Sequence, residues 1–402
     1  MRRKASFPKT QECGAPSDRA GFWVQQGSGS AAYRAFVPKP LPPDPSLRVD
    51  LSVQRLLERA SFAVGRLDGI GRLLPGPDEL LYSYVRKEAV LSSQIEGTQS
   101  SLADLLLHES SAAPGVPLDD VREVSNYIGA LNRGIELLKT LPLSLRLIRE
   151  VHRLLVQGTR GEHHTPGEFR RSQNWIGGTM PGNAYFVPPP PHEVMPALDN
   201  LEKFFHNTEL PALLKAGLVH AQFETIHPFL DGNGRVGRML IPLMLVAESA
   251  LERPWLYVSL YFKKHRSRYY ELLQKVRTHG AWEEWISFYL DGIAVVAEQA
   301  TSTIRKLLAL FERDRNALER SRGGSPYQRM AVHSNLEVYE HLRRKIAITI
   351  PETALACNTT KPTVARAVTD LEQLGIVKEV TGKARGRVYL YSGYLEILNE
   401  ES

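Results

Sequence analysis

The sequence predicts a mainly α-helical fold: a helical core with a β-hairpin flap, an N-terminal helical module and a C-terminal winged helix-turn-helix. Three observations support this prediction. Residues 78–95 lack glycine and proline and carry apolar residues at helical spacing. Residues 213–223 and 239–246 are apolar over most of their circumference, which is typical of buried helices. Residues 335–402 follow the order of three helices and a hairpin.

Length and composition set broad limits. The chain has 402 residues, of which 43% are hydrophobic and 23% charged, so two or three globular domains are expected. No apolar run is long enough to span a membrane, and no hydrophobic segment follows basic residues 2–4, so we expect neither a membrane anchor nor a secretory signal. Cys13 and Cys357 form neither a disulfide framework nor a zinc spacing, which fits the reducing cytoplasm.

The expected organisation runs from an extended or partly wrapped arm to a folded tail. The arm is expected because residues 1–45 are rich in Gly, Ser and Pro. The predicted boundaries are an extended arm at 1–45, a helical module at 46–140, a core at 141–310, a linker at 311–334 and a winged helix-turn-helix at 335–402. In the helical module we expect helices at 53–73, 78–95 and 118–138 and a loop at 110–117. In the tail we expect helices at 335–342, 351–356 and 360–374 and strands at 375–380 and 388–391.

Residues 227–238, between two buried helices, carry most of the chemical information. Their sequence is His-Pro-Phe-Leu-Asp-Gly-Asn-Gly-Arg-Val-Gly-Arg, and their flexible part consists of Gly232, Asn233 and Gly234. Glycine and asparagine adopt positive φ at low cost, so the N–H groups of this loop can converge on an anion where the second helix begins. Arg235 and Arg238 lie three residues apart on that helix, and guanidinium groups suit phosphate oxygens.

Two further side chains complete the chemistry expected of this segment. Asp231 offers the hard oxygen ligand that Mg²⁺ prefers, and His227 can take up a proton near neutral pH. These residues predict a nucleotide site where a target hydroxyl attacks phosphorus, His227 accepts its proton and pyrophosphate leaves. A Walker A loop is excluded, because no Lys-Ser or Lys-Thr pair follows the glycines.

At these residues the sequence resembles the Fic (Fido-domain) proteins, whose signature His-Pro-Phe-x-Asp-Gly-Asn-Gly-Arg-x-x-Arg it matches throughout. The resemblance implies transfer of AMP from ATP, with Mg²⁺, to a Ser, Thr or Tyr hydroxyl of a protein, self-modification included. It implies that His227 is the base and Asp231 the metal ligand. It assigns nucleotide binding to Gly232, Asn233, Gly234, Arg235, Gly237 and Arg238.

A hairpin is predicted at residues 175–187, the flap segment, where two β-prone runs flank a Pro-Gly-Asn turn. An edge hairpin beside a phosphate site can add a strand to an extended segment of a partner. The resemblance implies a flap that covers the nucleotide and clamps the target backbone. Its residues are Gly182, Asn183, Ala184, Tyr185, Phe186 and Val187.

An inhibitory element is predicted at the end of the 78–95 helix. Gly97 suits the position after a helix C-terminus, so Glu96 lies where the helix dipole disfavours a carboxylate and a cation from elsewhere would suit it. Ser92-Ser93-Gln94-Ile95-Glu96-Gly97 matches the inhibitory motif of the Fic proteins. The resemblance implies a regulatory N-terminal module in which Ser92, Glu96 and Gly97 form the motif. It implies that Glu96 pairs with Arg238 and blocks the productive γ-phosphate position.

Two aromatic pairs follow the core motif. The resemblance implies that Tyr269 and Tyr270 line the adenine pocket. Plain helix packing is the alternative for this pair, because aromatic residues at helical spacing are usually core. Trp282 and Trp285, three residues apart, are expected in the core.

The predicted winged helix-turn-helix could bind DNA or protein. Thr360, Lys361 and Arg366 lie early on the expected recognition helix, and the hairpin tip at 382–387 is basic. However, nine basic and nine acidic residues balance over 335–402, whereas a DNA-binding module usually carries clear positive charge. Protein interaction or homodimer formation is therefore favoured over DNA binding.

Three other interpretations stay open. The core could only sense nucleotide for a DNA-binding transcriptional regulator, although a pure sensor would not need His227. The same residues could instead remove AMP from a modified protein, with Glu96 orienting water. Another nucleotide, such as UTP, would also fit, because the contacts that select the base cannot be placed from the sequence.

Overall fold

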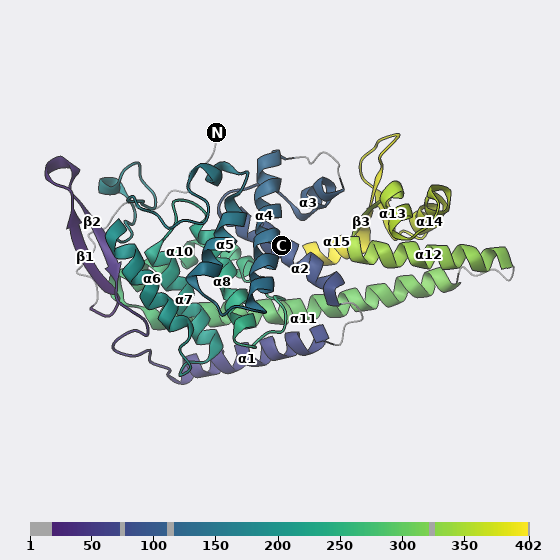
Figure 1. The fold of residues 1–402 in the computed structure, drawn as a ribbon. Helices are drawn as coiled ribbons and strands as arrows, with labels where there is room; N and C mark the ends of the chain where they lie inside the picture. The colour runs from purple at the N-terminus through teal and green to yellow at the C-terminus, as the bar shows by residue number, and fades with distance from the viewer. Residues whose placement is uncertain (1–17, 73–76, 111–115, 321–325, 401–402) are drawn as a thin grey trace.

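Helices dominate the computed structural model, which describes residues 18–72, 77–110, 116–320 and 326–400 (Figure 1). Two small antiparallel sheets lie at opposite ends of the molecule. The mainly helical fold class is confirmed. The parts of the predictions that fall on the arm at 1–17, which includes Cys13, and on 73, 111–115 and 321–325 lie outside the described residues. Among the described helices, none is long and apolar enough to cross a membrane.

Four helices precede the core. They are α1 (Leu51–Arg72), α2 (Pro77–Ile95), α3 (Leu102–Glu109) and α4 (Leu118–Leu138), and α1 packs along the long helix α11 (Trp282–Arg320). The predicted helices at this end are confirmed within a few residues. The sequence analysis missed α3, although a signal was available: Ser101 and Asp104 form a capping box, in which each side chain accepts a hydrogen bond from the other residue's N–H.

The core places two buried helices at its centre. It consists of α5 (Leu145–Val156), α6 (Pro191–Phe205), α7 (Ala212–Ile226), α8 (Asn233–Ala247), α9 (Ser259–Lys264), α10 (Arg266–His279) and α11. Every residue of α7 from 213 to 226 is buried, which confirms the central position predicted from its apolar circumference. Trp282 and Trp285 are buried as predicted. The α7–α8 connection, which holds residues 227–232, thus lies between two buried helices.

Of the two forms expected for the arm at 1–45, the described residues from 18 onward are folded against the flap segment and are not extended. Strands β1 (Gly21–Gln26) and β2 (Tyr33–Pro38) form an antiparallel hairpin closed by a short 3₁₀ turn, η1 (Gly29–Ala31). Phe36 of β2 is buried against Trp23 and Phe186, and its N–H donates to the carbonyl of Val187 at 2.9 Å. The hairpin is ordered because the flap segment covers its apolar face, which composition alone does not reveal.

The flap segment is less regular than the predicted hairpin. A single bridge pairs Ile176 with Phe186, and the tip is a 3₁₀ turn, η3 (Pro181–Asn183). The Asn183 side-chain oxygen accepts from the N–H groups of Thr179 and Met180 at 2.9 and 3.0 Å, which closes the tip. On the return arm, the carbonyl of Val187 also accepts from the N–H of Phe36 on β2.

The linker predicted at 311–334 is also wrong. Helix α11 continues unbroken to Arg320, and α12 (Pro326–Lys345) begins six residues later along the chain. Two tail hydroxyls explain the continuation: Tyr339 donates to the carbonyl of Phe311 at 3.1 Å, and Tyr391 donates to the carboxylate of Asp314 at 2.7 Å. The end of α11 therefore belongs to the core of the tail.

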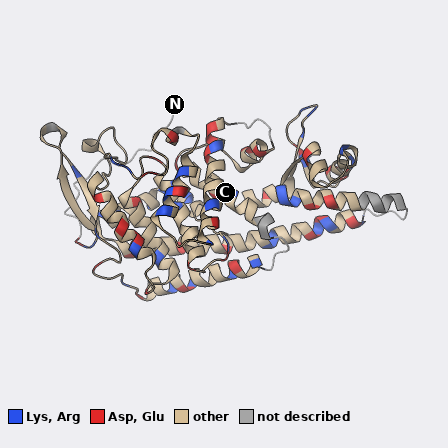
Figure 2. Ribbon diagram, viewed as in Figure 1, with Lys and Arg blue, Asp and Glu red and all other residues tan. Residues whose placement is uncertain are grey.

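The tail contains α12, β3 (Ala347–Thr349), α13 (Ile350–Ala356), α14 (Lys361–Gln373), β4 (Val377–Glu379), β5 (Val388–Tyr391) and α15 (Ser392–Asn399), with strand order β3-β5-β4. In the described part of α12, the acidic residues Glu337 and Glu340 precede a basic last turn, Arg343–Lys345 (Figure 2). The sequence analysis missed β3 and α15. Helix α15 touches α2: Ser83 and Tyr394 share a hydrogen bond of 2.9 Å, and the Lys87 ammonium donates to the carbonyl of Leu398 at 2.9 Å. The tail thus contacts the helix that ends beside Glu96.

Candidate active site

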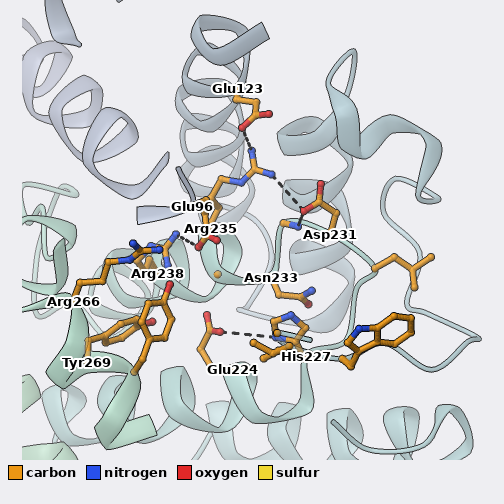
Figure 3. A pocket seen from close by; sticks show the side chains of 17 residues that line it. Glu96, Glu123, Glu224, His227, Asp231, Asn233, Arg235, Arg238, Arg266 and Tyr269 are labelled. Carbon is orange, nitrogen blue, oxygen red and sulfur yellow. Dashed lines mark hydrogen bonds and ion pairs between the residues drawn. The ribbon is translucent and has the colours of Figure 1, made fainter. Parts of the chain in front are cut away.

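A cavity of about 540 Å³ lies where the end of α2, the flap segment, the α7–α8 connection and α10 meet (Figure 3). Side chains far apart in sequence point into it from these four elements. The predicted site residues that line it are Glu96, His227, Asp231, Gly232, Asn233, Gly234, Arg235, Arg238, Tyr269 and Tyr270. The sequence analysis did not single out Glu123, Glu224 or Arg266, which also line it.

The glycine-rich loop is braced by its own asparagine. The Asn233 side chain accepts from the N–H of Phe229 and donates to the carbonyl of the same residue, both at 2.8 Å. Gly232 adopts a φ of +76°, which directs the chain into α8. A Cβ on Gly234 would lie 2.3 Å from a carboxylate oxygen of Glu96, so only glycine allows that close approach. The loop therefore presents the N–H groups at the start of α8 in a fixed geometry.

His152 of α5 fixes the same loop from behind. Its Nδ1 accepts from the N–H of Gly167 at 2.9 Å, so Nε2 carries the proton and donates to the carbonyl of Asp231 at 3.1 Å. Its ring stacks on Phe229 with 3.6 Å between centroids, and burial lowers the pKa of His152 to about 4. The sequence analysis missed this residue, because a lone histidine on an apolar helix face gives no specific signal.

His227 ends α7 in the left-handed conformation, with a φ of +49°. Its carbonyl accepts from Arg170 Nε at 2.9 Å and from Asn174 Nδ2 at 3.1 Å, which holds this unusual conformation. Burial, followed by the positive charges of Arg277 and Arg170, lowers the pKa of His227 to about 3. The imidazole is therefore neutral at pH 7 and has a lone pair available for a proton.

Arg238 is the most enclosed charge in the cavity, with 1% of its side chain exposed. It donates to a carboxylate oxygen of Glu96 at 2.7 Å, to the hydroxyl of Ser92 at 2.9 Å and to the carbonyl of Ser92 at 3.0 Å. Burial by itself would raise the pKa of Glu96, but the Arg238 charge outweighs it and lowers that pKa. Gly97 has a φ of +103°, which turns the chain away directly after Glu96. Ser92 and Glu96 of the predicted inhibitory motif thus bind Arg238.

Arg235 binds a different pair of carboxylates. Its guanidinium lies 3.3 Å from Glu123 on α4 and 3.9 Å from Asp231. A carboxylate oxygen of Asp231 also accepts from the N–H of Gly232 at 2.7 Å, and its side chain is 44% exposed toward the cavity. No group of three His, Cys, Asp or Glu side chains suited to a metal gathers within the described ranges. The exposed carboxylate of Asp231 could serve as the one protein ligand of a Mg²⁺, an ion that proteins often hold through one or two carboxylates.

The flap contributes to the cavity through its first arm. Trp175, Ile176 and Gly177 line the cavity, whereas the predicted residues Gly182, Asn183, Ala184, Tyr185, Phe186 and Val187 do not. Ala184, Phe186 and Val187 instead face the β1–β2 hairpin. The clamping role of these six residues stays a prediction.

Tyr269 and Tyr270 both line the cavity but differ in solvent exposure. Tyr269 is fully buried, and its hydroxyl lies 2.9 Å from Nε2 of His220, whose Nδ1 lies 2.8 Å from the carbonyl of Gly237. Gly237, predicted to bind nucleotide, is not among the residues lining the cavity. Tyr270 is partly exposed at its edge. Tyr269 therefore packs in the core and also lines the cavity, and the nucleotide-binding roles of Tyr269, Tyr270 and Gly237 stay predictions.

Comparison with known proteins identifies the domain around this cavity. Residues 54–136 match the Fic/DOC family N-terminal model, and residues 142–245 match the Fic/DOC family model. This chain carries a Fic domain. The Fic domain spans α5 to α8 and so contains the whole 227–238 segment.

Curated relatives carry the same domain. The chain is 30% identical over 211 residues to the protein adenylyltransferase Fic of Drosophila virilis, covering 49% of this chain and 39% of that protein. It is 28% identical over 211 residues to the protein of the same name in Drosophila melanogaster, covering 49% and 38%. The chain thus matches well under half the length of these relatives. A crystal structure of a Fic family protein from Desulfovibrio desulfuricans superposes with a TM-score of 0.56 at 18% identity, covering 86% of this chain and 97% of that one, so the two share a fold.

Proposed function

We propose that this chain is a protein adenylyltransferase that moves AMP from ATP to a Ser, Thr or Tyr hydroxyl of a protein, and that Glu96 restrains it. One observation carries the proposal: a neutral histidine, an N–H-rich loop and two arginines converge on one cavity. The name of the curated relatives, protein adenylyltransferase Fic, supports the same activity.

The proposed reaction follows from these positions. The N–H groups at the start of α8 and the guanidinium of Arg235 hold phosphate oxygens. Asp231 would hold a Mg²⁺, which would neutralise charge on the phosphates when bound. The target hydroxyl loses its proton to His227 as its oxygen bonds to the α-phosphorus, and the bond from that phosphorus to pyrophosphate breaks. Burial of the cavity strengthens each of these electrostatic contacts.

The proposed restraint follows from the contacts of Arg238. While its guanidinium is bound to Glu96 and Ser92, it is not available to a γ-phosphate, and the carboxylate repels that phosphate. Removing Glu96 frees Arg238 for phosphate and removes the repulsion. The same carboxylate, placed in the cavity, could orient water for removal of AMP, so the experiment below includes that outcome.

We further propose that residues 335–402 form a winged helix-turn-helix that serves protein interaction. The order of helices and strands in the tail supports this assignment, and its balanced charge favours a protein partner, including a second copy of the chain, over DNA.

Label transfer from α-³²P-ATP with Mg²⁺ tests the main proposal. We expect weak self-labelling of the wild type, strong labelling of Glu96→Gly and none of Glu96→Gly/His227→Ala. A chain that binds ATP but labels nothing in all three forms would contradict the proposal. If the wild type releases label from a premodified protein and the two variants do not, the activity is AMP removal instead.

A further inference from the structure

Glu224 occupies the floor of the cavity between Tyr269 and His227 (Figure 3). It lies on α7, three residues before His227, and is 6% exposed. One carboxyl oxygen packs against Gly237 of α8 so closely that a Cβ there would lie 2.4 Å away. The other lies 4.0 Å from Nδ1 of His227. The small residue at 237 therefore makes room for a carboxyl group that faces the imidazole.

The two facing groups each hold an unsatisfied atom. Glu224 Oε1 and His227 Nδ1 are buried and make no hydrogen bond of normal geometry. An unsatisfied buried polar atom costs about 1–3 kcal/mol, so such atoms in a cavity usually have a function or a partner that is acquired there. Oε1 is the oxygen against Gly237, and the facing oxygen, Oε2, lies 4.0 Å from Nδ1, so the two groups must approach by about 1 Å to form a hydrogen bond.

We propose that Glu224 is a positioning residue for His227: its carboxylate accepts the Nδ1–H of the imidazole and keeps Nε2 free for the proton of the target hydroxyl. This inference rests on the proposed AMP transfer. The proton passes from the hydroxyl to Nε2 and stays on the imidazole, while Glu224 remains a carboxylate that stabilises the imidazolium. No other group changes its protonation in this step.

The charges around His227 explain why such a partner matters. Arg277 and Arg170 already disfavour the protonated imidazole, so a proton arriving from the target meets positive charge on two sides. A carboxylate beside Nδ1 offsets that repulsion, because opposite charges within about 4–6 Å favour the charged form. The geometry follows the usual arrangement in which a catalytic base is held by a third group.

The ionisation of Glu224 depends on all the charges that face it. Burial raises the pKa of Glu224 to about 7; Arg238 opposes this rise, Glu96 adds to it and Arg277 opposes it. These charges come from α8, from the end of α2 and from α10, and His227 faces Glu224 from the α7–α8 connection. The carboxylate form gains population as pH rises through about 7, so AMP transfer is expected to rise over the same interval.

The test compares Glu224→Gln and Glu224→Asp in the Glu96→Gly background, with Glu202→Gln as the matched control. Glu202 accepts the N–H of Leu145 and lies outside the cavity. We expect Glu224→Gln to lower kcat about tenfold or more and to remove the rise near pH 7, because glutamine cannot balance an imidazolium. The affinity for ATP and the thermal midpoint should stay close to those of the parent, and Glu224→Asp should retain part of the rate and the pH dependence.

An unchanged kcat and pH profile in Glu224→Gln would overturn the inference, and so would a loss confined to ATP affinity, which would make Glu224 a nucleotide contact. A second readout separates this inference from the proposed function. In ¹⁵N-histidine NMR of the full chain, with the signal assigned by His227→Ala, we expect the Nδ1–H form in the parent and a lower pKa of His227 in Glu224→Gln. Identical His227 spectra in both chains would refute the positioning role even if the parent transfers no AMP.

Discussion

Glu96→Gln tests whether the charge of Glu96, and not only its bulk, restrains the chain. Glutamine has nearly the same shape and can still accept one hydrogen bond from Arg238. It loses the negative charge that lies 2.7 Å from that buried guanidinium. The two bonds from Arg238 to Ser92 are unaffected, so the guanidinium stays in place. The variant thus isolates the electrostatic part of the restraint.

The structure sets the scale of the effect. A hydrogen bond to a charged group contributes about 1.5–3 kcal/mol, which corresponds to roughly a tenfold to 150-fold change in an equilibrium. The Glu96 side chain is 39% exposed, so solvent screens the pair and the lower part of this range is expected. AMP transfer by Glu96→Gln should therefore exceed the wild-type rate about tenfold and fall below that of Glu96→Gly, which loses both the charge and the acceptor.

Initial rates of label transfer at low and at high salt measure this prediction. Screening weakens a partly exposed ion pair, so the advantage of Glu96→Gln over the wild type should shrink as salt rises. Glu58→Gln, an exposed change on α1, is the matched control and should leave the rate unaltered. A Glu96→Gln rate equal to that of the wild type at both salt concentrations would refute an electrostatic restraint.

Three further predictions concern packing around the site. His152→Ala should lower AMP transfer roughly a hundredfold in the Glu96→Gly background, because the Asp231 carbonyl loses its hydrogen bond and a loop shift of about 1 Å has that effect. A rate within twofold of the parent would show that the loop keeps its conformation without His152. Gly237→Ala should lower the free energy of unfolding in urea by about 1–3 kcal/mol, because its Cβ would collide with Glu224; an unchanged midpoint would contradict the close approach. Between α2 and α15, Lys87→Met should lower the free energy of unfolding by about 1.5–3 kcal/mol, because the Leu398 carbonyl loses its hydrogen bond. The same variant should be cleaved faster by protease at α15. If Lys87→Met resists protease as well as the wild type does, other contacts hold α15.

The helices before and within the Fic domain were predictable because their signals are local. The apolar circumference of 213–223 and the uninterrupted pattern of 78–95 each predicted a helix that the structure contains. The errors lie where order depends on distant partners. The β1–β2 hairpin is folded because Phe36 packs on Phe186, about 150 residues away, and α11 continues past 310 because tail hydroxyls bind its last turns. The sequence near the hairpin or near the end of α11 contains no signal of these distant partners.

The sequence by itself determined which groups residues 227–238 carry, and it predicted a nucleotide site from a histidine, an aspartate, the glycines and two arginines at fixed spacing. Only the tertiary structure decided how those groups are held. It placed Glu96 on Arg238 across 142 residues of sequence, His152 behind the loop and Glu224 beside His227. Spacing along the chain fixes which groups are present on one element. Their charges and protonation depend on burial and on neighbours brought in by other helices, which no local pattern encodes.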